Sequence, residues 1–125
     1  MQKFFVSLGL ASALFLSGCS LSTADRAVVT ANATRDVAEA EAALIQAYCV
    51  PKYQAVSKRE ELEAVDKVCL PARTAYLSTK VLWKTLVGVI RLAESGQAKD
   101  DEILQAVQDL AEALADLRTL VGGLK

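Results

Sequence analysis

Hydrophobic residues recur along most of this chain at intervals of three and four, which is the period of an α-helix packed on one face. The last segment shows this best, because its apolar positions follow a heptad seam. These positions are Ile103, Val107, Leu110, Leu114, Leu117 and Val121. Acidic residues at 100–102 suit the start of this helix, and Gly122-Gly123 would end it. The seam fits packing inside one bundle or a coiled coil with another chain.

Three earlier helices are predicted over residues 24–48, 58–69 and 71–95. The first is expected to pack through an alanine-rich seam: Ala33, Val37, Ala40, Leu44 and Tyr48. The third is expected to bury a wide apolar arc between two or more neighbours. Its core face is Leu82, Leu86, Val89, Ile90 and Ala93, widened by Tyr76, Leu77, Val81, Trp83, Val87 and Leu92.

Proline is expected to interrupt the helices at two places. Cys49-Val50-Pro51 and Cys69-Leu70-Pro71 are predicted breaks, because proline disfavours the α conformation in the residue before it. Ser57-Lys58-Arg59-Glu60 fits a capping box that opens the short helix. No stretch alternates with the period of a strand. The predicted fold is therefore all-α, a small up-down bundle of three long helices and one short helix over residues 24–125.

The amino-terminal segment has the three parts of an export signal. Lys3 gives a positive start, residues 4–16 form an apolar run, and small residues precede Cys19. The run is shorter than the roughly 20 apolar residues that a transmembrane helix needs. Leu16-Ser17-Gly18-Cys19 resembles the lipobox of bacterial lipoproteins, and the resemblance covers residues 1–20.

The resemblance implies that residues 1–18 are a signal peptide that is removed and that Cys19 carries diacylglycerol and an N-acyl chain. In Gram-negative lipoproteins the next residue helps to sort the protein. If the host is Gram-negative, Ser20, in place of the aspartate of inner-membrane lipoproteins, implies an outer-membrane anchor facing the periplasm. Residues 19–23 would be the lipidated amino terminus and a short tether. Ser20 to Thr23 reach roughly 14 Å when extended, so the domain is expected to stay close to the membrane.

Cys49 and Cys69 are the other cysteines of the chain. Export would place them in an oxidising compartment, where paired cysteines usually bond. A Cys49–Cys69 disulfide is therefore predicted, closing a loop of about 20 residues. Two free thiols buried in the core are the alternative.

Charge and residue types limit the function classes. The formal net charge of −1 argues against nucleic-acid binding, which needs a basic surface. The chain has no histidine, so the usual general base and the commonest metal ligand are missing. Paired carboxylates in an apolar setting, an activated serine and phosphate-binding glycines are also not recognisable. A non-enzymatic protein without metal or cofactor is predicted.

Two charged ridges are the remaining candidates for a contact site. Arg73, Lys80, Lys84 and Arg91 share one helix face, here called the basic ridge. Anionic head groups, a cell-wall polymer or an acidic partner would suit it. Glu102, Asp109, Glu112 and Asp116 form the acidic ridge opposite the heptad seam. Both ridges also fit plain solvated faces, or they pair between copies in a head-to-tail oligomer.

These observations favour an envelope lipoprotein that acts by protein contact, as a structural or assembly accessory. A phage- or plasmid-encoded lipoprotein for entry exclusion or lysis is one alternative. A carrier of a small apolar ligand, bound near Trp83, is another and would need a cavity.

Overall fold

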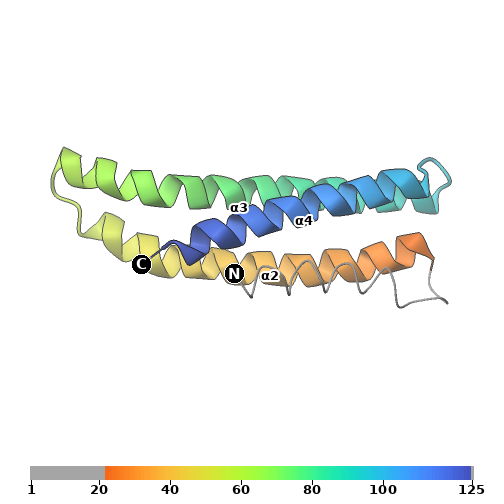
Figure 1. Ribbon diagram of the computed structural model, residues 1–125, viewed down its shortest axis with the longest axis horizontal. Helices are drawn as coiled ribbons and strands as arrows, with labels where there is room; N and C mark the ends of the chain where they lie inside the picture. Colours follow the sequence, from red (N-terminus) through yellow and green to blue (C-terminus); the bar gives the residue numbers. More distant parts are fainter. Residues whose placement is uncertain (1–21, 125) are drawn as a thin grey trace.

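The computed structural model describes residues 22–124, and within them the chain folds into three helices without a strand. These are α2 (Thr23–Gln54), α3 (Arg59–Glu94) and α4 (Asp100–Gly122). The predicted all-α bundle is confirmed (Figure 1). The predicted signal peptide, Cys19 and the residues up to 21 lie outside the described part of the chain.

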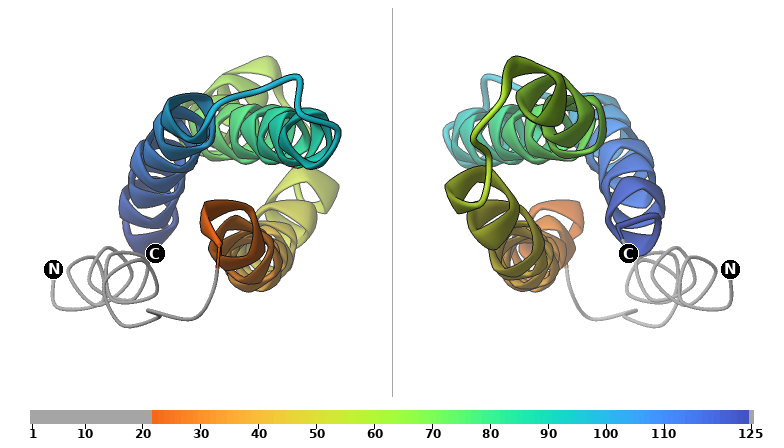
Figure 2. Two further views of the ribbon diagram at one scale, coloured as in Figure 1. Left: turned by 90° about the vertical axis from the view of Figure 1, so that its right-hand side faces the viewer. Right: turned by 90° about the vertical axis from the view of Figure 1, so that its left-hand side faces the viewer.

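The helices run up, down and up, so α2 and α4 are parallel and α3 is antiparallel to both (Figure 1). Viewed from either end, they surround a common axis (Figure 2). The start of α2, the end of α3 and the start of α4 share one end of the rod, which we call the base. The turn at 55–58 forms the tip, and α4 ends before reaching it.

Proline does not divide the chain as predicted. The expected short helix over 58–69 and the helix over 71–95 are one helix, because α3 passes through Pro71. Likewise α2 continues past Pro51 to Gln54. Pro71 itself is exposed, whereas Cys69 and Ala72 on either side of it are buried. Packing of these neighbours outweighs the roughly 3 kcal/mol that an interior proline costs.

A side chain caps the start of α2, whereas no side chain caps the start of α3. Ser22 caps α2, and its hydroxyl accepts the Asp25 N–H at 3.1 Å. The N-cap of α3 is Lys58, which makes no side-chain cap, so the predicted capping box is wrong. Instead the Ser57 N–H donates to the carboxylate of Glu61 at 3.1 Å. The N-cap is Lys58 and not Ser57, so the helix begins one residue later than the capping box requires. The glutamate that accepts the Ser57 N–H is accordingly Glu61 and not Glu60.

The core confirms the heptad seam of α4 as packing within one chain, because all six of its residues are buried. The buried face of α2 is rotated from the predicted seam, and Ala40 and Leu44 of that seam are exposed. Three of its buried positions are polar. Thr30 and Thr34 donate their hydroxyls to Arg26 and Thr30 carbonyls one turn earlier, and Glu41 pairs with α4. Polar groups that have hydrogen-bond partners can be buried. The positions of the apolar residues alone therefore predicted the wrong buried face for α2.

The wide arc of α3 is buried only on one side. Leu86 and Ile90 are buried, and Leu82, Trp83, Val89 and Ala93 pack against the same cluster as half-buried side chains. Leu77, Val81 and Leu92 are 49%, 62% and 44% exposed, which contradicts their predicted burial. With only α2 and α4 beside it in residues 22–124, α3 keeps its outer side open to solvent.

Candidate interaction site on α2, α3 and α4

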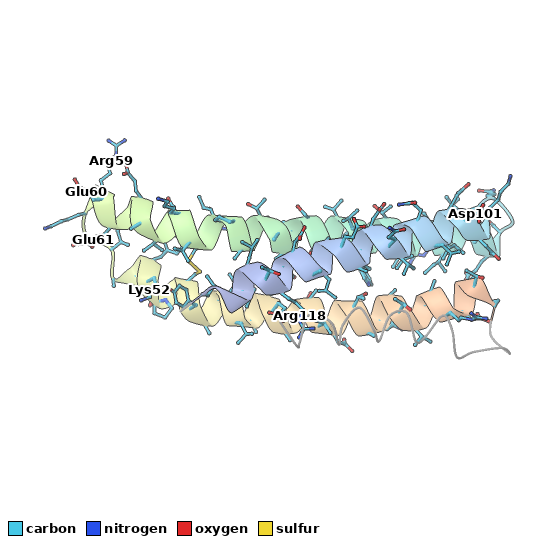
Figure 3. All side chains as sticks on the ribbon, viewed as in Figure 1. Lys52, Arg59, Glu60, Glu61, Asp101 and Arg118 are labelled. Carbon is cyan, nitrogen blue, oxygen red and sulfur yellow. A yellow bond between two sulfur atoms is a disulfide. The ribbon has the colours of Figure 1, made fainter. Side chains whose placement is uncertain are left out.

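The predicted disulfide is present and joins α2 to α3 near the tip of the rod. Cys49 and Cys69 are bonded with their Cα atoms 6.0 Å apart, as the yellow bond in Figure 3 shows. Both residues are buried, at 5% and 3% exposure. The bond fixes the spacing of the two helices within a core cluster that also contains Leu117 and Val121 of α4.

Beside the disulfide, the surface between α2 and α3 is hollowed into an elongated groove. One part has a volume of about 380 Å³ and is lined by Ile45, Val50 and Leu77 together with the two cysteines. A smaller part, about 180 Å³, lies closer to the base around Trp83. Tyr76 borders both parts. We refer to the two parts together as the α2–α3 groove.

Two aromatic side chains tie the walls of the groove together. The Tyr76 hydroxyl donates to Glu39 Oε1 at 3.0 Å. Burial, and then this hydrogen bond, raise the pKa of Tyr76. The Trp83 Nε1–H donates to the Ala31 carbonyl at 2.8 Å, and the Arg35 guanidinium lies 6.0 Å from the centre of the Trp83 ring, within cation–π range.

The rim of the groove is mainly cationic. Arg73 lines the larger part, and Arg35 and Lys80 line the smaller part together with Glu39. Arg73 and Lys80 also belong to the basic ridge, so the ridge borders the groove at these two residues. All four ridge residues are exposed. This surface can bind an anionic group while covering an apolar one, which the sequence alone does not reveal.

The acidic ridge is exposed at Glu102, Glu112 and Asp116 and half-buried at Asp109. The side-chain amide of Gln105 donates to Asp109 at 2.9 Å, and Gln108 donates to Glu112 at 3.4 Å in the same way. In residues 22–124 the ion pairs are Arg35–Asp36, Arg59–Glu63 and Arg118–Glu41. Neither ridge therefore pairs with a charge in the described part of its own chain.

Two polar contacts between helices were not predicted. Arg118 of α4 lies 3.3 Å from Glu41 of α2, and both side chains are largely buried. Figure 3 places Arg118 where α4 approaches α2. Tyr53 donates to Asp66 at 2.6 Å near the tip. This hydrogen bond first, then burial, raise the pKa of Tyr53, against a lowering effect of the Arg73 charge. Each contact joins polar side chains of two different helices, which the period of the apolar residues along one helix does not predict.

Comparison of the chain with protein-family models, curated proteins and solved structures finds no match. None of the helices in residues 22–124 is long and apolar enough to cross a membrane. The same residues hold no cluster of three or more histidine, cysteine or acidic side chains that a metal ion would need.

Proposed function

We propose that this protein is a non-enzymatic lipoprotein, held at the bacterial envelope by lipid on Cys19, that acts by contact with a protein partner. The observation that carries the proposal is the short spacing between lipobox and bundle. Cys19 precedes Ser22, the N-cap of α2, by three positions. An anchor so close to a helix start would hold the base of the rod at the membrane and direct its sides to neighbouring proteins.

The contact surface of this proposal is the basic ridge with the adjoining α2–α3 groove. Protein interfaces gain most of their binding free energy from apolar and aromatic groups, and the surrounding charges determine which partner binds. Leu77 and Val50 expose 49% and 47% of their surface beside the groove, and the cationic rim favours an acidic partner. The absence of histidine from the chain and the exposure of most of the described carboxylates support a role without catalysis.

Cross-linking in the native host tests the proposal. Wild-type protein and Cys19→Ala are each cross-linked in cells, and the captured proteins are compared. We expect wild type to capture a specific envelope protein, and Cys19→Ala to lose both membrane attachment and that partner. Lipid anchoring at Cys19 would be contradicted if Cys19→Ala captured the same partner to the same extent as wild type. It would also be contradicted if Cys19→Ala stayed in the membrane fraction as wild type does. A membrane-bound wild type that captures nothing would contradict the contact function.

A carrier role is the second candidate, favoured by the size of the groove. Ligand pockets usually measure about 300–1,000 Å³, and the larger part reaches about 380 Å³. Trp83, the single tryptophan of the chain, borders the smaller part and reports on it. Titration with a long-chain fatty acid should then change Trp83 fluorescence to saturation at one equivalent. An unchanged spectrum would exclude such a carrier.

A further inference from the structure

The basic and acidic ridges have matching positions along the rod. The residues of α3 approach the base as their numbers rise, and those of α4 leave it. With a helical rise of about 1.5 Å per residue, each charge has a height above the helix end at the base, Glu94 for α3 and Asp100 for α4. Arg91 and Glu102 lie about 4.5 and 3 Å above it.

The next charges also fall at nearly equal heights. Lys84 and Asp109 lie about 15 and 13.5 Å above the base. Lys80 and Glu112 lie about 21 and 18 Å above it. Arg73, farthest from the base, lies several ångströms beyond Asp116. Three of the four basic residues therefore have an acidic counterpart at their own height.

The two ridges cannot meet within one copy. Arg73, Lys80 and Arg91 each directly follow a buried residue of α3, and Glu102, Asp109 and Asp116 each directly precede a buried residue of α4. One residue turns a helix by about 100°. On α3 the ridge lies one residue after the core, and on α4 one residue before it. Because the two helices are antiparallel, these two steps are rotations in the same direction when viewed from one end of the rod. The ridges consequently lie on different sides of the rod, each on the flank of its own helix.

We propose that copies of this chain associate side by side and parallel, with the basic ridge of one copy against the acidic ridge of the next. Parallel packing keeps every height unchanged, so Arg91, Lys84 and Lys80 meet Glu102, Asp109 and Glu112 of the second copy. The basic intervals of seven, four and seven residues read the same in both directions, so charge spacing alone also fits a reversed copy whose base is displaced along the rod. The parallel sense is therefore taken from the shared membrane anchor of the proposed function.

The inference deepens the proposed function and rests on it for orientation. Chains anchored at Cys19 in one membrane all have the base of the rod at that membrane, so they meet in the parallel sense. Single exposed ion pairs are weak, but several act together here, and confinement to a membrane raises the effective concentration of partners. The surfaces that meet are different patches of the chain, so the contact repeats from copy to copy.

The association can be tested by charge reversal in the full-length protein, cross-linked in native membranes with an amine-reactive reagent. One variant combines Lys80→Glu with Lys84→Glu, and the other combines Asp109→Lys with Glu112→Lys. Lys58→Glu with Lys67→Glu is the matched control, because it makes the same charge change and removes the same number of lysines at exposed positions off the ridge. Wild type and the control should give a ladder of oligomers that high salt weakens.

Each ridge variant alone should lose the cross-linked dimer by about tenfold or more, because like charges would face each other. Co-expression of the two variants should restore the ladder, since each then offers the charge that the other requires. A monomeric wild type, unaffected variants, or no restoration in the mixture would overturn the inference. The same membranes report the anchor separately: a membrane-bound monomer refutes only the association, whereas protein missing from the membrane fraction refutes the proposed function.

Discussion

Removal of the disulfide should show how much the bundle depends on a covalent link near its tip. Cys49 and Cys69 are separated by 20 positions. In the chain-entropy model, cross-linking a loop of this length restricts the unfolded chain by about 3 kcal/mol. The bonded cysteines are also buried, so Cys49→Ala with Cys69→Ala loses some packing in addition. We therefore expect a loss of about 3–4 kcal/mol in the free energy of unfolding.

The loss can be measured by urea unfolding followed by far-ultraviolet circular dichroism, with wild type under oxidising and reducing conditions beside the double variant. Reduction should reproduce most of the effect without changing a side chain. For a domain of this size, the loss corresponds to a decrease in Tm of more than about 10 °C. A difference below about 1 kcal/mol would contradict this expectation and show that the link restricts little in the unfolded chain.

Three further substitutions test separate parts of the fold by the same unfolding measurement. Pro71→Ala should stabilise the protein by about 1–2 kcal/mol, because a continuous α3 gains a helical hydrogen bond; destabilisation would show that the proline suits a real break. Leu86→Ala, at a fully buried position, should cost about 3 kcal/mol, whereas Val81→Ala, 62% exposed, should stay within about 0.5 kcal/mol. The pKa of Tyr53 is raised in the folded protein, so this group contributes stability that is present below pH 10.0 and is lost as the pH rises beyond it. Tyr53→Phe should therefore reduce the fall in the free energy of unfolding at alkaline pH. An unchanged slope of that free energy against pH would exclude the Tyr53 hydroxyl as its cause.

The sequence predicted the helical class and the packing of α4 because both follow from strong apolar periodicity. The seam from Ile103 to Val121 is buried throughout, since its repeat matches the helical period. The disulfide was predicted through export, which the amino-terminal pattern indicates, and not through knowledge of distances. Exposure of the two ridges followed from the same periodicity, except at Asp109, which is half-buried.

The face of α2 and the course of α3 were not predictable by the same means. Thr30, Thr34 and Glu41 are buried because carbonyls and Arg118 satisfy their polar groups, and such partners are known only once the helices are placed. Pro71 sits inside α3 because tertiary packing outweighs a local preference. The groove depends on how Tyr76 and Trp83 meet the opposite helix, so it exists only in the assembled bundle.

The proposed function depends on lipid attachment at Cys19, which mass spectrometry of the protein purified from host membranes measures. We expect an amino-terminal peptide that begins at Cys19 and carries the mass of diacylglycerol and an N-acyl chain. A peptide that begins at Met1, or one cleaved elsewhere with an unmodified Cys19, would contradict it.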